Sequence, residues 1–174
     1  MCGIFGYLGH QQALPILVEG LRRLEYRGYD SIGVAVDDGE TIQTHKTVGK
    51  VSDLKSILPA SIDGTLGIAH TRWATHGGVT QANAHPHASE NGTVHLVHNG
   101  IIENFQQLRK SLSKRGVECK SETDSEVLAH MMALELEKGA EPLDAVLSTL
   151  RRLRGTWGLC LSLIHISEPT RPNE

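Results

Sequence analysis

Apolar residues recur at the three- and four-residue spacing of an amphipathic helix in four parts of the chain. The first pattern ends at Gly28, and the third opens with Thr123 and Glu126 at the spacing of a capping box. A shorter and weaker pattern predicts another helix over residues 52–58. The four main predicted helices cover residues 13–28, 104–116, 123–139 and 141–155.

Short apolar runs between these helices are typical of β-strands. Asp38 and Gly39 separate two of the runs with a residue pair that favours a tight hairpin turn. Paired strands come first and a block of helices follows, which favours an α+β fold of antiparallel sheets covered by helices over a doubly wound parallel sheet. The predicted strands cover residues 3–8, 31–38, 41–48, 65–71, 93–99 and 156–163.

The composition of the chain argues against several classes of function. The chain has 174 residues, of which 39% are hydrophobic and 21% charged, as in ordinary globular proteins. Its net charge of −3 provides no basic surface for nucleic acid or an anionic membrane. No apolar run approaches the roughly 20 residues that span a bilayer, and the N-terminus lacks the pattern of a signal peptide. A cytoplasmic protein is therefore expected.

The second residue, Cys2, has an unusual chemical setting. Only three cysteines occur, too few and too scattered for a disulfide framework. Removal of Met1 would place the Cys2 thiol and a free α-amine on one residue. Because an α-amine has a pKa of about 7.7–8.0, it can act as the base for the thiol of its own residue. The alternative is a small apolar residue in the first strand.

Three further motifs carry groups that suit an amino-acid ligand. Arg72 has a planar guanidinium that matches a carboxylate. Asn99 and Gly100 offer a side-chain amide and a backbone N–H that can converge on one oxyanion. Asp124, at a predicted helix start, could hold an ammonium group, although acidic residues favour helix N-termini in any case. Taken singly, Arg72 also suits a surface loop and Asn99-Gly100 a tight turn. Taken together with a thiol, they describe a site for glutamine.

Six segments of the sequence closely resemble the glutaminase domain of the glutamine–fructose-6-phosphate aminotransferases (isomerizing). They are MCGIFGY, LRRLEYRGYDSIG, HTRWATHG, NAHPH, VHNGIIEN and SETDSEV. The resemblance implies an N-terminal-nucleophile (Ntn) hydrolase fold, a four-layer αββα sandwich of two antiparallel sheets that is incomplete at the C-terminal side. It also implies hydrolysis of glutamine to glutamate, with the ammonia passed to a sugar phosphate to form glucosamine 6-phosphate.

Five residues match the reactive and substrate-binding positions of that family. By this resemblance Cys2 is the nucleophile, and Asn99 and Gly100 form the oxyanion hole. Arg72 binds the carboxylate of glutamine, and Asp124 binds its α-amine.

Five more residues match supporting positions. Trp73, Thr75 and His76 correspond to the loop that closes over glutamine, with Trp73 suited to an apolar lid. Arg27 and Gly28 belong to the YRG motif that flanks and supports the nucleophile.

Other assignments fit the sequence less well. The glutaminase domains of purine-pathway amidotransferases and of asparagine synthetases share the nucleophile, but their HRGQD, RYST and RGPD motifs differ from YRGYD and RWAT here.

A zinc site is an alternative use of the histidines at positions 85, 87, 95 and 98, but no cysteine or carboxylate has standard ligand spacing. No metal or cofactor is expected. A non-catalytic interaction module or an inactive fragment would be indifferent to substitution of Cys2.

The end of the sequence departs from the family pattern. Residues 1–161 are expected to form the partial amidotransferase domain, and residues 162–174, SLIHISEPTRPNE, a disordered tail of other origin. The sugar-isomerase domain is expected to be absent, so the sugar-phosphate acceptor would be reached only through a domain outside this chain. By resemblance, the full-length relatives are homo-oligomeric.

Overall fold

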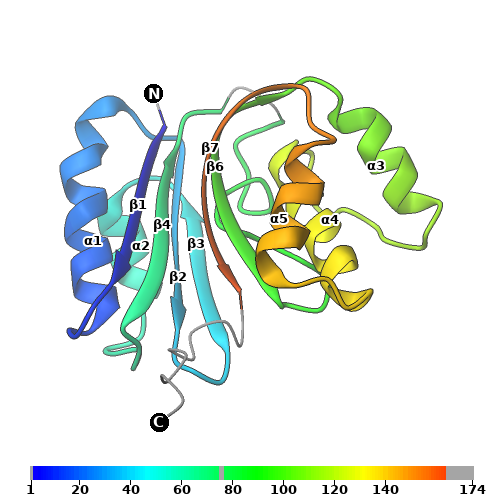
Figure 1. Cartoon of the computed structure of the whole chain (residues 1–174). Coiled ribbons are helices and arrows are strands. Elements are labelled where there is room, and N and C mark those ends of the chain that lie inside the picture. The colour runs from blue at the N-terminus through cyan, green and yellow to red at the C-terminus, as the bar shows by residue number, and fades with distance from the viewer. Residues whose placement is uncertain (1, 75–76, 164–174) are drawn as a thin grey trace, which may run out of the picture.

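The computed structural model describes residues 2–74 and 77–163, and Figure 1 shows them as four layers. Two antiparallel sheets lie face to face between two layers of helices. The first sheet has the order β1-β4-β2-β3 and the second the order β5-β6-β7. The strands of the first are β1 (Gly3–Leu8), β4 (Leu66–Arg72), β2 (Ser31–Asp37) and β3 (Ile42–Val48). Those of the second are β5 (His87–Ala88), β6 (Val94–Ile102) and β7 (Gly155–Leu163). This arrangement confirms the α+β sandwich.

Helices cover the outer face of each sheet. Beside the first sheet lie α1 (Ala13–Leu24), the 3₁₀ turn η1 (Glu25–Arg27) and α2 (Val51–Ile57). Beside the second lie α3 (Phe105–Ser113), α4 (Ser125–Glu137) and α5 (Pro142–Leu150). Among these described residues, no helix combines the length and the apolar character that a bilayer crossing requires.

Strand alternation divides the buried side chains into three cores. In β2, Val34 and Val36 pack with α1, whereas Ala35 points to the opposite face and joins a small core between the sheets. In β6, Leu96 packs with the α3–α5 helices and Val97 belongs to the core between the sheets. The alternation continues along β6. Asn99 lies two residues after Val97 and points toward the first sheet, whereas His98, between them, points toward the helices.

The predicted helices and the hairpin are confirmed, although the helix predicted over residues 141–155 ends at Leu150 and Gly155 begins β7. The hairpin joins β2 to β3, with Asp37 opposite Ile42 and Gly39 at φ +92° in the turn. The helix that ends at Gly28 ends as η1, and Gly28 adopts φ +98°. The two-residue strand β5 has no clear sequence signal and was not predicted.

The capping box of α4 forms only in part. The Glu126 N–H donates to Thr123 Oγ1 at 3.4 Å, as predicted. The Glu126 carboxylate instead accepts hydrogen bonds from the N–H groups of Lys120 and Ser121, at 2.8 and 2.6 Å.

The boundary expected at residue 162 needs correction. Ser162 and Leu163 belong to β7, where they pair with His95 and Val94, and both are buried. They agree with the strand predicted over residues 156–163, and the ordered domain therefore extends at least two residues past the expected start of the tail. The rest of that predicted tail lies outside the described residues.

Candidate active site

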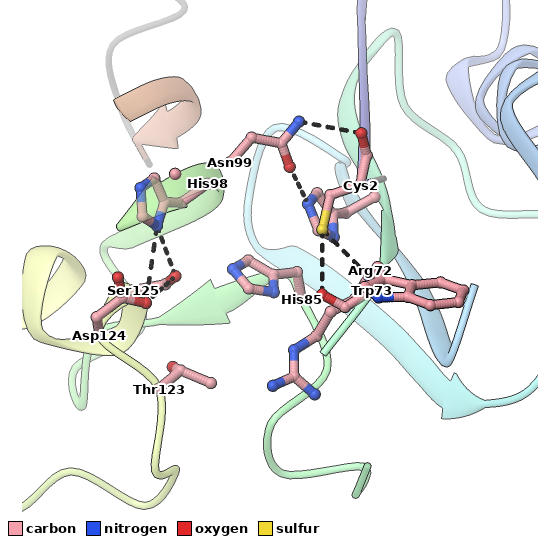
Figure 2. Close-up of a pocket in the computed structure, with 11 residues that line it drawn as sticks. Cys2, Arg72, Trp73, His85, His98, Asn99, Thr123, Asp124 and Ser125 are labelled. Atoms are coloured by element: carbon pink, nitrogen blue, oxygen red, sulfur yellow. Dashed lines mark hydrogen bonds and ion pairs between the residues drawn. The ribbon is translucent and has the colours of Figure 1, made fainter. Parts of the chain in front are cut away.

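One pocket collects most of the residues that the sequence marked for chemistry. It encloses about 320 Å³ of space, part of it open to solvent, between the start of β1, the end of β4, the middle of β6 and the start of α4. The start of β1 and the end of β4 are neighbours because Gly3 pairs with Thr71. Figure 2 shows the pocket, which is lined by Cys2, His70, Arg72, Trp73, His85, His98, Asn99, Gly100, Thr123, Asp124 and Ser125.

The Cys2 thiol is held by the backbone of the chain that follows β4. Its Sγ accepts a hydrogen bond from the Trp73 N–H at 3.1 Å and lies 3.4 Å from the Trp73 carbonyl oxygen. The other two cysteines do not line the pocket. Burial raises the pKa of Cys119 to about 11 and also raises the pKa of Cys160. Their thiols are therefore poor nucleophiles at neutral pH.

The Asn99 side chain lies between the nucleophile and β4. Its Nδ2 donates to the backbone carbonyl of Cys2 at 3.4 Å, and its Oδ1 lies 2.8 Å from Nε2 of His70. Figure 2 shows the amide nitrogen directed at the Cys2 carbonyl. The amide thus has its hydrogen-bond donors beside the thiol-bearing residue, where an oxyanion hole requires them.

Asn99 and Gly100 both lie inside β6, which continues to Ile102, whereas the predicted strand ended at Asn99. Asn99 pairs with Gly158 and Gly100 with Trp157 of β7. Gly100 adopts φ +134°, and a Cβ built on it would lie 2.1 Å from the Thr156 carbonyl oxygen. Glycine is required there by both the backbone angle and the close approach of β7.

Arg72 ends β4 and is 4% exposed, so its charge is directed into the protein. Burial lowers its pKa, while the surrounding acidic groups, including Asp30 and Asp124, oppose that shift. Its Nη1 donates to the Gly78 carbonyl at 3.1 Å. A guanidinium remains charged in such a setting, and it therefore supplies the positive charge of the pocket.

The carboxylate of Asp124 faces the pocket from the N-cap position of α4. Its Oδ2 accepts the Ile102 N–H at 2.8 Å, and its Oδ1 accepts from Ser125 Oγ at 3.2 Å. His98 Nδ1 is 2.8 Å from the same Ser125 hydroxyl. Burial lowers the pKa of His98 against the opposing effect of Asp124. A chain of hydrogen bonds therefore runs from His98 through Ser125 to Asp124.

Asp30 was not among the predicted site residues, but it supports the site from outside the pocket. Its carboxylate accepts the Ala74 N–H at 2.6 Å, and its own N–H donates to the Arg72 carbonyl at 2.7 Å. It ends the YRGYD segment, two residues after Gly28. Arg27 is exposed, and neither Arg27 nor Gly28 lines the pocket. Asp30 therefore links this motif to the chain segment of Arg72 and Ala74.

Trp73 lines the pocket with a side chain that is 50% exposed. Thr75 and His76, expected in the same loop, lie outside the described residues.

Three histidines of the pocket were missed as site residues. His70, His85 and His98 are each at most 4% exposed. The rings of His70 and His85 stack with centroids 4.3 Å apart, and the ring of His85 meets that of His87 at 4.5 Å. The available signal was their place within the HTRWATHG, NAHPH and VHNGIIEN segments. Within residues 2–74 and 77–163, no three His, Cys, Asp or Glu side chains are grouped to hold a metal ion.

Comparison with known proteins places the chain in a family. The family described as "Glutamine amidotransferase domain" matches residues 52–161. The glutamine–fructose-6-phosphate aminotransferase (isomerizing) of Idiomarina loihiensis is 51% identical over 160 residues, 91% of this chain and 26% of that protein. The enzyme of the same name from Mesorhizobium japonicum is 49% identical over 162 residues, 92% of this chain and 26% of that protein. The chain thus spans about a quarter of the length of these curated relatives.

Solved structures agree on the fold. The glutamine phosphoribosylpyrophosphate amidotransferase of B. subtilis superposes with a TM-score of 0.79 at 28% identity, over 94% of this chain and 35% of that one. A structure described as the allosteric regulatory enzyme of purine biosynthesis gives a TM-score of 0.80 at 30% identity, over 93% of this chain and 35% of that one. These purine-pathway relatives share the sandwich, but their sequences are less similar than those of the fructose-6-phosphate enzymes. The chain therefore belongs to the glutamine amidotransferase domain family, with an Ntn-hydrolase fold.

Proposed function

We propose that this domain hydrolyses glutamine to glutamate and ammonia with the Cys2 thiol as nucleophile. The observation that carries the proposal is the convergence in one pocket of a thiol, an amide donor, a buried cation and a buried carboxylate from four separate elements. These groups complement the reacting amide, the α-carboxylate and the α-ammonium of a single glutamine molecule.

The reaction begins at the thiol. Cys2 Sγ attacks the side-chain amide carbon of glutamine, and its proton passes to the α-amine that removal of Met1 leaves on the same residue. The amide oxygen becomes an oxyanion, which the Asn99 Nδ2–H and the Gly100 N–H stabilise. The carbon–nitrogen bond then breaks as the proton moves to the leaving nitrogen, releasing ammonia and leaving a γ-glutamyl thioester. Water attacks the thioester, which yields glutamate and the free thiol.

Two charged groups hold the amino-acid end of the substrate. Arg72 binds the α-carboxylate and Asp124 the α-ammonium, so the side-chain amide extends toward Cys2. Both groups are buried, and opposite charges attract more strongly there than in bulk water. The side chain of Trp73, with the loop that contains Thr75 and His76, closes over the bound glutamine. Arg27 and Gly28 support the nucleophile through the segment that ends in Asp30.

The ammonia serves the synthesis of glucosamine 6-phosphate from fructose 6-phosphate. Support for this acceptor comes from the name shared by relatives that are 49–51% identical to the chain. The sugar-phosphate site belongs to a second domain that lies outside these 174 residues. By resemblance to the family, the assembled enzyme is a cytoplasmic homo-oligomer.

A glutaminase assay on the purified chain tests the proposal. Release of glutamate and ammonia is measured for the unmodified chain, for Cys2→Ala and for Cys119→Ala as a matched control. We expect Cys2→Ala to abolish turnover and Cys119→Ala to retain it. A glutamine-like electrophile should label Cys2 alone. Turnover by Cys2→Ala, or labelling of Cys119 or Cys160 in its place, would exclude this mechanism.

A further inference from the structure

Asn99 can stabilise an oxyanion only in one of its two amide orientations. With Nδ2 toward Cys2, the side chain offers hydrogen-bond donors. After a rotation of 180° it offers a carbonyl oxygen, which would repel a developing negative charge. The two orientations have almost the same shape, so packing alone discriminates poorly between them. The hydrogen-bond partners of Asn99 must therefore set the orientation.

Two partners define that orientation. The Cys2 backbone carbonyl, 3.4 Å from Asn99 Nδ2, can only accept a hydrogen bond. His70 Nε2, 2.8 Å from Asn99 Oδ1, can donate one. In the opposite orientation two carbonyl oxygens would face each other at the Cys2 end. The Cys2 carbonyl excludes this opposite orientation, and the Nε2–H tautomer of His70 then holds the amide through the shorter of the two contacts.

We propose that His70 is a positioning residue for the oxyanion hole, because its Nε2–H holds the Asn99 amide with the NH₂ group facing the nucleophile. The inference rests on the proposed role of Asn99 and adds a residue that acts through it.

The surroundings of His70 keep its ring neutral and its single proton on Nε2. The residue is 0% exposed on β4, and burial lowers its pKa to about 4, against the opposing hydrogen bond with Asn99. The ring is therefore neutral near pH 7 and carries a single proton. Since Asn99 Oδ1 can only accept, that proton lies on Nε2.

The ring of His70 is also held against movement. It stacks on His85 with centroids 4.3 Å apart and an interplanar angle of 32°. Gly33 pairs with His70 across β2 and β4. A Cβ at Gly33 would lie 2.3 Å from the His85 backbone carbonyl, so the absence of a side chain there lets the His85 loop reach this stack.

Kinetics of three variants of the full chain test the proposal. His70→Phe keeps a ring and removes the donor, His70→Gln keeps a donor near the Nε2 position, and His95→Gln is the control. His95 is also buried, but it does not line the pocket. We expect His70→Phe to lower kcat by about tenfold or more, with KM nearly unchanged. His70→Gln should recover most of the loss, and His95→Gln should behave as the unmodified chain.

A double-mutant cycle separates positioning from general destabilisation. Once Asn99→Ala has removed the amide, adding His70→Phe should lower kcat no further. Independent, additive losses would overturn the proposal, as would a full kcat in His70→Phe or equal losses in His70→Phe and His70→Gln.

Nitrogen NMR of the histidine rings gives a readout that does not depend on turnover. At pH 7 we expect His70 to be protonated on Nε2 and bare on Nδ1, and His70→Phe to shift the side-chain amide signals of Asn99. The opposite tautomer would overturn the positioning role. If this tautomer is found but the unmodified chain does not hydrolyse glutamine, the proposed function fails while the hydrogen bond to Asn99 stands.

Discussion

The Asp124 carboxylate accepts a hydrogen bond from the Ile102 backbone N–H at 2.8 Å, which ties the start of α4 to the end of β6. The contact fixes one carboxylate oxygen and leaves the group lining the pocket. The same residue therefore joins two elements and supplies negative charge to the site. A substitution that keeps the hydrogen-bond acceptor but removes the charge separates these two roles.

Asp124→Asn should weaken the use of glutamine while preserving the fold. Loss of one charge-assisted hydrogen bond of about 1.5–3 kcal/mol predicts a fall in kcat/KM of about 10- to 150-fold. Arg72→Met should give a similar fall by removing the partner of the α-carboxylate. The measurement is steady-state glutaminase activity. If the unmodified chain accepted a substrate without an α-amine as readily as glutamine, Asp124 would not be the ammonium partner.

Asn99→Ala should act on the transition state more than on binding. Removal of one oxyanion-hole donor lowers kcat by about 10²–10³. KM should change little, because the neutral amide oxygen of bound glutamine accepts a weaker hydrogen bond from this donor than the oxyanion does. Initial rates over a range of glutamine concentrations separate the two constants. A raised KM with an unchanged kcat would assign Asn99 to substrate binding instead.

Gly100→Ala should disturb both stability and activity. The residue has φ +134°, and the new Cβ would lie 2.1 Å from a backbone oxygen of β7. Strained backbone of this kind costs about 1–3 kcal/mol, which a denaturant titration would measure. Gly158→Ala is the matched control, because Gly158 pairs with Asn99 and a Cβ there would meet its nearest atom only at 3.9 Å. Equal losses of stability in the two variants would contradict this account of Gly100.

Acidification should destabilise the fold between about pH 6.5 and 4. Burial lowers the pKa of His70 and of His95 to about 4 from the ordinary value of 6.5. In that interval the unfolded chain binds more protons than the folded one, so the free energy of unfolding falls as the pH falls. His95→Gln should flatten this dependence by up to about 1.4 kcal/mol per pH unit.

His10→Gln is the matched control for the acid effect, because His10 is exposed. Chemical denaturation at several pH values gives the slope for each variant. If the free energy of unfolding depended on pH equally in His95→Gln and His10→Gln, His95 would not be a cause of the acid effect.

The sequence predicted those parts of the site that depend on residue type and local spacing. The helix that ends at Gly28 and the Asp38–Gly39 hairpin follow from such local signals. Arg72, Asn99 and Asp124 were identified from the chemistry of their side chains and the family resemblance, and the fold brings them to one pocket.

Contacts between distant segments could not be predicted in the same way. The hydrogen bond from His70 to Asn99 joins residues 29 positions apart on facing sheets and depends on how those sheets pack. The role of Asp30 likewise depends on the path of the chain after β4. The predicted strand ended at Asn99, because the Asn99-Gly100 pair is of a type common in turns. The extended pairing of β6 with β7 overrides that local preference.

The central claim is that one residue, Cys2, supplies both the nucleophile and its base. The most direct test compares the unmodified chain with a variant that carries one glycine inserted between Met1 and Cys2. Mass spectrometry establishes the first residue of each purified protein, and a glutaminase assay follows on the same samples. We expect the chain that begins at Cys2 to hydrolyse glutamine and the variant, whose thiol no longer shares a residue with a free α-amine, to be inactive. Full activity in the variant, or in protein that retains Met1, would contradict the account.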